Sequence, residues 1–264
     1  MAIKNAVIIG TSTGIGKELS NTIAEDTKYN LIKASHHKHN GYEYLDLTKR
    51  KSIALFANRL KENNIEIDLL VLNSGIASAN AIRHTNDEQL DNCFQINTIN
   101  QILLIREITP LLKRGAKVVF INSKSALVTL PFLGVYAATK KANLAIAEVL
   151  EFEFKPLGVD VISIFLGNTK TKMWSLKLKS QTEITTTNYT YEKQIVNALK
   201  LAIKKYESAM DPEFVAERIY NIINSARPRH KYYIGKDTIT FLILKYLLPK
   251  LFFNRIIKKQ YGFN

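Results

Sequence analysis

The chain has 264 residues, of which 46% are hydrophobic and 23% charged, and its formal net charge is +14. This length suits one large α/β domain with a full core, and the single cysteine, Cys93, excludes an internal disulfide. The positive charge could favour nucleic acid, an anionic membrane surface or an anionic cofactor. No nucleic-acid motif accompanies the charge, and aromatic residues are not interleaved with the lysines, so no nucleic-acid partner is expected.

The N-terminus "MAIKNAVIIGTSTG" has a short apolar run that leads directly into glycines. It lacks the apolar length and the cleavage site of a signal peptide, so it is interpreted as a first strand. We therefore expect a cytoplasmic protein.

Apolar runs of strand length alternate with helical patterns along the chain. Strands are expected at "NAVIIG", "NLIKAS", "YEYLDL", "IDLLVLNSG", "AKVVFINS" and "VDVISIFLG", and helices at about 17–25, 49–63, 87–112 and 136–154. Strands that are apolar throughout and separated by helices indicate a parallel sheet covered on both faces. The prediction is a single α/β domain over residues 1–264, a Rossmann-type doubly wound sheet.

Glycines follow the first strand and open the first helix, at Gly10, Gly14 and Gly16. In such sheets the ligand crevice lies at the carboxyl ends of the strands, and glycines there let a pyrophosphate approach the helix N-terminus. The spacing G-x-x-x-G-x-G therefore predicts a dinucleotide site, although a purely structural turn has a similar sequence.

The loop after the second strand reads "SHHKH" and contains no acid. An NAD site places an acid there to bind the ribose hydroxyls. Ser35 and Lys38 would suit a 2′-phosphate better, so NADP is favoured over NAD. The alternative is an exposed basic loop with no part in cofactor choice.

Five Tyr-x-x-x-Lys pairs occur: Tyr29/Lys33, Tyr136/Lys140, Tyr189/Lys193, Tyr232/Lys236 and Tyr246/Lys250. On a helix, residues four apart lie on the same face, so each pair could place a phenol beside an ammonium. Spacing alone does not choose among them.

In its order of motifs, the chain resembles the short-chain dehydrogenase/reductase family over roughly residues 3–172. The glycine motif, Asp46 in "YLDLT", "NSG" at 73–75 and Asn97 in "FQINTINQ" match family positions. In the family, the catalytic serine ends strand five about thirteen residues before the tyrosine, and Ser123 stands thirteen residues before Tyr136. The resemblance thus selects Tyr136/Lys140 and implies a catalytic tetrad of Asn97, Ser123, Tyr136 and Lys140.

The loop after the second strand and the resemblance together predict the residues that bind the cofactor, and no metal is expected. They are Gly10, Ser12, Thr13, Gly14, Ile15, Gly16, Ser35, Lys38, Asp46, Leu47, Asn73, Ser74, Gly75, Tyr136, Lys140, Gly167, Asn168, Thr169 and Thr171. Where the family has proline after strand six, this chain has Leu166, so the turn that carries Asn168 and Thr171 is expected to be looser.

The residue types suit proton transfer. A free tyrosine has a pKa near ~10, and Lys140 one turn away is expected to favour the phenolate and lower that pKa. Tyr136 could then protonate a carbonyl oxygen, or deprotonate an alcohol in the reverse reaction. Ser123 would bind the substrate oxygen. By resemblance, Lys140 also binds the nicotinamide ribose and Asn97 orders a water.

Two variable segments remain. Residues 172–210 are expected to form a substrate lid, in which Met173, Trp174 and Leu176 either line a lipophilic pocket or pack a lid helix. Residues 227–264 form a basic amphipathic tail, interrupted by Pro249. It could cover the pocket, contact a partner subunit or lie on an anionic membrane as a peripheral anchor. By resemblance, a homodimer or homotetramer is expected.

The sequence thus predicts an NADP-dependent oxidoreductase that transfers a hydride between nicotinamide and a carbonyl/alcohol substrate, expected to be lipophilic. The alternatives are a cofactor-binding sensor without turnover and a membrane-associated scaffold on the same fold.

Overall fold

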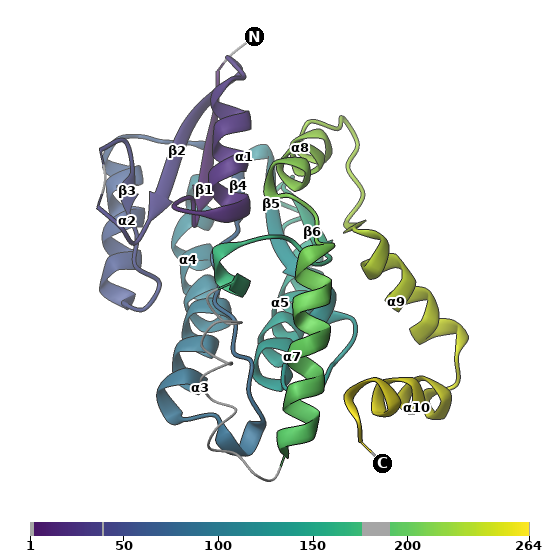
Figure 1. Ribbon diagram of the computed structural model, residues 1–264. Coiled ribbons are helices and arrows are strands. Elements are labelled where there is room, and N and C mark those ends of the chain that lie inside the picture. Colours follow the sequence, from purple (N-terminus) through teal and green to yellow (C-terminus); the bar gives the residue numbers. More distant parts are fainter. Residues whose placement is uncertain (1–2, 39, 176–190, 264) are drawn as a thin grey trace.

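The core of the fold is a parallel sheet, in which the carboxyl ends of all strands lie at the same edge. The computed structural model describes residues 3–38, 40–175 and 191–263. In this part of the chain seven parallel strands form one sheet in the order β3-β2-β1-β4-β5-β6-β7 (Figure 1). They are β1 (Lys4–Ile9), β2 (Tyr29–Ser35), β3 (Glu43–Tyr44), β4 (Ile67–Leu72), β5 (Leu112–Ser123), β6 (Asp160–Leu166) and β7 (Lys231–Ile234).

The strand order reverses beside β1, which pairs with β2 on one side and β4 on the other. Loops after β1 and β4 therefore leave the sheet in different directions and open a crevice between them, as in other doubly wound folds. The predicted sheet and its doubly wound class are confirmed.

Helices cover both faces of the sheet, which explains why its strands are apolar throughout. On one face, α2 (Arg50–Glu62), α4 (Asn100–Ile108) and α5 (Gly134–Glu153) form a core that includes the fully buried Phe56 and Leu104. On the other face, α1 (Gly14–Ala24) and α8 (Pro212–Ile223) pack against each other and the sheet (Figure 1).

The C-terminal segment adds a third cluster. It is built by α7 (Glu192–Glu207), α9 (Lys236–Leu247) and α10 (Lys250–Tyr261), and α10 contacts both other helices. In Figure 1, α9 and α10 lie at one flank of the molecule and α7 stands beside them in front of α5. Ile257 and Tyr261 of α10 are buried together with Phe165 of β6. Within the described ranges, no helix has the length and apolar character needed to cross a membrane.

The single helix expected at 87–112 is wrong. The segment is divided into α3 (Asp87–Phe94), a π-helical turn (Gln95–Ile99), α4 and a short 3-10 turn (Thr109–Leu111). Pro110 cannot donate a backbone hydrogen bond, which ends α4, and β5 then begins at Leu112. A π-turn inside a helix frequently marks a functional position, and this one contains Asn97.

The expected third strand is much shorter than "YEYLDL". Only Glu43 and Tyr44 pair, because β3 is the edge strand and has a single neighbour, β2.

Of the expected lid, residues 172–175 form a helical turn and α7 occupies 192–207, while 176–190, including Leu176, lie outside the described residues.

Candidate active site

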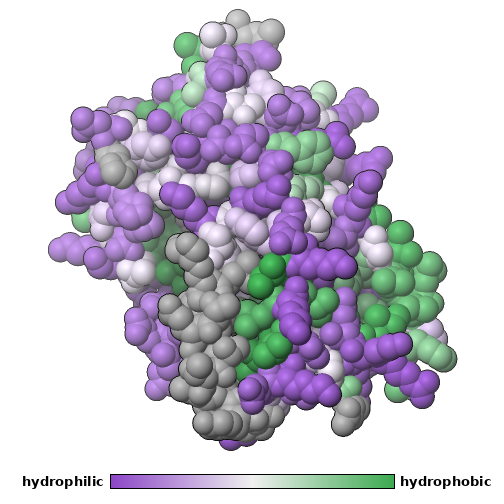
Figure 2. Space-filling model, viewed as in Figure 1, coloured by the Kyte–Doolittle hydropathy of each residue, from purple (hydrophilic) through white to green (hydrophobic). Residues whose placement is uncertain are grey.

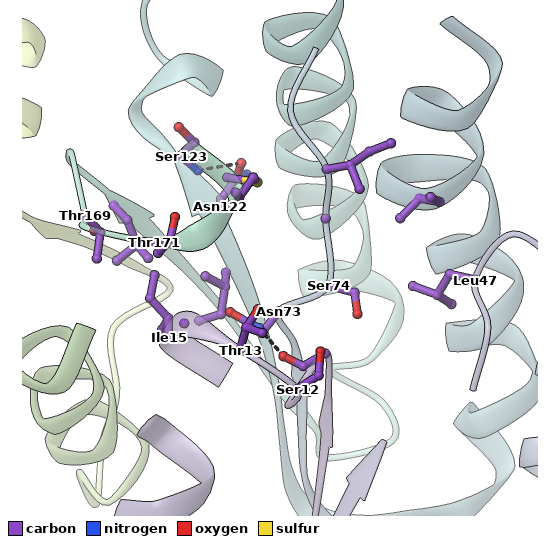
Figure 3. A pocket seen from close by; sticks show the side chains of 18 of the residues that line it. Ser12, Thr13, Ile15, Leu47, Asn73, Ser74, Asn122, Ser123, Thr169 and Thr171 are labelled. Atoms are coloured by element: carbon purple, nitrogen blue, oxygen red, sulfur yellow. Dashed lines mark hydrogen bonds between the residues drawn. The ribbon is translucent and has the colours of Figure 1, made fainter. Parts of the chain in front are cut away.

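A cavity of about 350 Å³ opens at the carboxyl ends of β1, β4, β5 and β6. Leu47 lies at one end and Thr169 and Thr171 at the other, with Ser12, Thr13 and Asn73 between them (Figure 3). Most of the predicted site residues line it: Gly10, Ser12, Thr13, Gly14, Ile15, Asp46, Leu47, Asn73, Ser74, Gly75, Ser123, Tyr136, Lys140, Gly167, Thr169 and Thr171.

Gly16 does not line this cavity, and its position explains why the loop needs a glycine there. A Cβ atom on Gly16 would lie 2.0 Å from the Gly10 carbonyl oxygen and 2.4 Å from Asn73 Nδ2. Asn73 Nδ2 itself donates to that carbonyl at 2.8 Å and thereby links the β1 loop to the β4 loop. Gly16 is thus a packing residue that lets α1 begin close to the sheet.

The loop after β2 is placed differently from the prediction. Ser35 is buried, and its Oγ accepts from the His37 amide at 3.1 Å, so it faces its own loop. Lys38 lies with Nζ 5.4 Å from the Tyr44 ring centroid and does not line the cavity. His36, which the sequence did not single out, does line it. Burial lowers the pKa of His36, and His37 lowers it further, while Asp46 opposes both.

Asp46 is fixed in the cavity wall by its own loop. Its Oδ1 accepts from the amide and the hydroxyl of Thr48, at 2.9 and 2.7 Å. Its Oδ2 pairs with Lys49 Nζ at 3.2 Å. Burial raises the pKa of Asp46, but the contacts to Thr48 and Lys49 outweigh it and leave the pKa lowered. The carboxylate is therefore ionised and held in one position.

Tyr136 and Ser123 meet where β5 ends and α5 begins. Tyr136 is 4% exposed, and its ring stands edge-on to Trp174 with the centroids 5.7 Å apart. Burial raises the pKa of Tyr136 to about 12, and a hydrogen bond with Ser123 opposes that rise. Ser123 is held in turn, because its Oγ accepts from the Ser125 amide at 3.1 Å.

Lys140 lies one helical turn beyond Tyr136 and is also buried, at 5% exposed. Its Nζ is 5.8 Å from the Tyr136 ring centroid and donates to the Ile121 carbonyl at 3.3 Å. Burial lowers the pKa of Lys140 to about 8, although Cys93 opposes this. The expected lowering of the Tyr136 pKa is wrong for this structure, since desolvation of the phenolate outweighs the opposing hydrogen bond with Ser123.

Asn97 does not line the cavity but is fixed directly behind it. Its Oδ1 accepts from the Ile76 amide at 2.8 Å, and its Nδ2 donates to the Ile76 carbonyl at 2.8 Å. Nδ2 also lies 3.1 Å from Thr139 Oγ1 on α5. Asn97 thus ties the β4 loop to the helix that carries Tyr136 and Lys140.

A second cavity of about 150 Å³ adjoins the first. Asn168, which was predicted to bind the cofactor, lines this second cavity and not the first. Ser123, Gly167, Thr169 and Trp174 line both cavities, so the two meet beside Ser123. Its lining is mainly apolar and includes Leu130, Phe132, Leu133, Ile195, Leu199, Leu201 and Tyr261.

Two buried polar atoms in the first cavity have no protein partner among the residues described: Thr171 Oγ1 and Asn122 Nδ2. Buried donors and acceptors are normally paired, so each calls for a partner from a ligand. Together with the glycine loop at the N-terminus of α1, they fit a dinucleotide with pyrophosphate and amide groups. The donor set therefore suits a nicotinamide dinucleotide.

Several wall residues were missed by sequence reasoning. Leu45, Thr48, Ile76, Ile96, Ile121, Asn122 and Leu166 line the first cavity. Most are apolar strand-end or helix residues that cannot be told from core residues by pattern. Asn122 and Thr48 could have been found, because each directly adjoins a predicted site residue at a strand end.

Known relatives support the interpretation of this geometry. The family model described as short chain dehydrogenase matches residues 4–182. An uncharacterized oxidoreductase YusZ of Bacillus subtilis is 29% identical over 82% of this chain and 78% of its own length. An NADPH-dependent 3-dehydrocapnine reductase of Ornithobacterium rhinotracheale is 25% identical, covering 98% and 97%. A yeast NADPH-dependent 1-acyldihydroxyacetone phosphate reductase is 26% identical, covering 85% and 80%.

Solved structures share the fold. A short chain dehydrogenase family protein of Francisella tularensis has a TM-score of 0.78 at 19% identity, covering 90% of this chain and all of its own. One from Burkholderia cenocepacia, in complex with NADP, has a TM-score of 0.72 at 19% identity and covers 93% and 95%. One from Burkholderia phymatum, in complex with NAD, has a TM-score of 0.76 at 17% identity and covers 93% and 94%.

The chain therefore belongs to the short-chain dehydrogenase family. It is an NAD(P)-dependent oxidoreductase that acts on CH–OH or C=O groups.

The buried ammonium yields a prediction about stability. The folded-state pKa of Lys140 is about 8 against an ordinary value of 10.5, so between these values the unfolded chain binds a proton that the folded chain does not. The free energy of unfolding of the wild type should therefore rise with pH across this window relative to Lys140→Met, by up to ~1.4 kcal/mol per pH unit. Urea unfolding at several pH values checks this. A rise no larger than that measured against Lys141→Met, its exposed neighbour, contradicts it.

Proposed function

We propose that this protein is an NADP-dependent carbonyl reductase in which Tyr136 is the general acid and base. One observation carries the proposal: Tyr136, Ser123 and Lys140 line the first cavity together, and Ser123 also lines the second cavity. A substrate carbonyl in the second cavity would reach the phenol and the Ser123 hydroxyl where the two cavities meet.

Burial of Tyr136 suits it to act as the general acid. With its pKa raised to about 12, the phenol keeps its proton at neutral pH and could donate it to a carbonyl oxygen. In the oxidising direction the phenolate would have to form first, at a cost set by the same desolvation.

Ser123 and Lys140 would support the proton transfer. Ser123 would donate a hydrogen bond to the substrate oxygen as negative charge develops. Lys140, whose pKa is lowered to about 8, is mainly charged at neutral pH and would stabilise the phenolate left behind. Asn97, hydrogen-bonded to the Ile76 backbone, would hold α5 at a fixed position relative to the β4 loop.

The first cavity would hold the cofactor, which supplies the hydride when bound. Ser12, Thr13 and Gly14 at the N-terminus of α1 would bind the pyrophosphate. Asp46 and Leu47 would contact the adenine end, and Asn73, Ser74 and Gly75 the ribose region. Thr171 Oγ1, Asn122 Nδ2 and the turn at 167–169 would meet the nicotinamide.

NADP is favoured because no acid follows β2, where an NAD site would bind the ribose hydroxyls. In place of an acid the loop carries Ser35, His36, His37 and Lys38. Lys38 lies beside Tyr44 and two residues beyond His36 of the cavity wall, and its long side chain could turn to reach a 2′-phosphate. Two relatives named above are NADPH-dependent, whereas the solved structures include both an NADP and an NAD complex.

The substrate is proposed to be lipophilic, because the second cavity is lined mainly by apolar side chains. Such pockets bind apolar ligands by removing their surface from water. The yeast relative is named for an acylated ketone phosphate, a substrate of that character.

A homodimer or homotetramer is proposed through α4 and α5. Three large apolar side chains are exposed there: Ile102 on α4 and Val149 and Phe152 on α5, the last 76% exposed. Burial of such residues between copies would stabilise the assembly.

A second apolar surface lies on α9 and α10, and we propose that it binds an anionic membrane peripherally. Large apolar side chains are exposed along both helices (Figure 2): Ile239, Ile243, Tyr246, Leu247, Leu251, Phe252 and Ile256. The same helices contain six Lys or Arg residues and a single acid, Asp237. Apolar side chains flanked by cations are typical of helices that lie in a membrane interface.

The Tyr136→Phe variant should lose most of its turnover with NADPH and a ketone. Removing a general acid costs about 10²–10⁴-fold in rate, and the rest of the cofactor site is unchanged. Steady-state kinetics and a fluorescence titration with NADPH check this. The control, Tyr42→Phe, should keep its activity. Unchanged turnover in Tyr136→Phe would refute its role as general acid, whereas NADPH binding without turnover in the wild type would leave the sensor alternative.

Wild-type protein should bind NADPH more tightly than NADH. Lys38→Ala should weaken NADPH binding more than NADH binding, because a cation is lost where a 2′-phosphate would lie. Fluorescence titrations with both cofactors measure this, with Lys61→Ala at the far end of α2 as the control. Tighter NADH binding by the wild type would refute the NADP preference.

Double substitution of Leu247 and Leu251 by Ser should reduce binding to phosphatidylglycerol vesicles about tenfold or more, because each leucine loses its buried apolar area. Leu55→Ser/Leu157→Ser, equally apolar and on other surfaces, is the matched control. Vesicle co-sedimentation and light scattering are the measurements. Unchanged vesicle binding together with a smaller oligomer would assign the surface to a second copy of the chain.

A further inference from the structure

Two lysines stand in the mainly apolar wall of the second cavity. Lys124 follows Ser123 directly and is 9% exposed, and Lys205 comes from α7 and is half-buried. Lysine is almost never buried without a partner, since removing an ammonium from water costs several kcal/mol. The presence of two of them in one apolar wall therefore needs an explanation.

One carboxylate serves both cations. Lys124 Nζ pairs with Asp237 at the start of α9 and also donates to Asn168 Oδ1 at 2.7 Å. Asp237 Oδ2 accepts in addition from the Asn168 amide at 3.0 Å. In the part of the chain that the structure describes, Lys205 forms no ion pair with a carboxylate, so the cluster has one cation in excess.

The two ammonium groups are close enough to repel each other. Both lie over the ring of Phe241, with Nζ 5.7 Å from the centroid for Lys124 and 5.5 Å for Lys205. Burial lowers the pKa of Lys205, and Lys124 lowers it further, while Asp237 opposes both. An anion placed between the lysines would remove this repulsion.

We propose that Lys124 and Lys205 bind the anionic headgroup of an amphiphilic substrate, a phosphate monoester or a similar oxyanion, while its chain occupies the apolar wall. This inference rests on the proposed function, since it names the class of ketone that the site would reduce. Lys124 follows Ser123 in the sequence, so the headgroup would lie close to the reacting carbonyl. Leu130, Leu133 and Leu199 would contact the chain.

The only tryptophan, Trp174, lines both cavities and reports on binding without turnover. Its fluorescence is titrated with octyl phosphate, 1-octanol and inorganic phosphate. Octyl phosphate should bind at least about tenfold more tightly than 1-octanol, because hydrogen bonds to charged groups contribute strongly to the binding free energy. Inorganic phosphate should bind more weakly than octyl phosphate, since it lacks the chain.

Lys205→Met is the test variant, because Lys205 has no ion pair to lose, and Lys204→Met is the matched control, an exposed lysine on the same helix. Lys205→Met should weaken octyl phosphate binding about tenfold and leave 1-octanol binding unchanged, whereas Lys204→Met should alter neither. Equal effects of the two variants, or no preference of the wild type for octyl phosphate over octanol, would overturn the proposal. So would binding of inorganic phosphate as tight as that of octyl phosphate, which would indicate a free-phosphate site.

The outcomes separate this inference from the proposed function. If Lys205-dependent binding of octyl phosphate is found but no ketone is reduced, the headgroup site stands and the reductase proposal fails. If neutral lipophilic ketones are reduced with no headgroup preference, the reductase stands and the headgroup site is overturned.

Discussion

Tyr136 and Lys140 are both buried from solvent in the wall of the first cavity, beside the end of β5, and the site depends on this burial. It moves the pKa of the phenol up to about 12 and that of the ammonium down to about 8. Both shifts favour the uncharged form, because desolvation acts against charge of either sign. The phenol of Tyr136 therefore stays protonated over a wider pH range, and the fold bears the desolvation cost of the Lys140 ammonium.

Keeping these two groups in place requires several elements far apart in the sequence. Asn97 in the π-helical turn binds the Ile76 backbone and Thr139, and so connects β4 with α5. Ser123 is fixed by the Ser125 amide on the other side. The glycine loop is joined to β4 by Asn73. Together these contacts determine where the phenol lies.

The C-terminal tail also belongs to the site. A Cβ atom on Gly167 would lie 2.0 Å from Asp237 Oδ1, so the turn after β6 closes directly onto α9. Asp237 holds Asn168 and Lys124 at this turn, where the chain has Leu166 in place of the family's proline. A proline would stiffen the turn by fixing its backbone, and here a carboxylate from the tail provides the restraint. The tail therefore connects the apolar surface on α9 and α10 with the wall of the second cavity.

The sequence by itself determined the sheet and the position of the glycine loop, because these depend on local patterns: apolar runs and glycines at a strand end. Tyr136 was singled out among five equally spaced pairs by the resemblance to a known family, in which a serine stands thirteen residues before the tyrosine. The sequence also placed most of the cavity lining correctly, since residues at the carboxyl ends of parallel strands meet at one edge. Only the tertiary structure decided the rest. The direction of the Tyr136 pKa shift, the place of His36 and not Ser35 in the wall, and the meeting of Lys124, Lys205 and Asp237 all depend on burial and on contacts between distant segments. Desolvation and long-range packing are properties of the folded chain, and no local pattern encodes them.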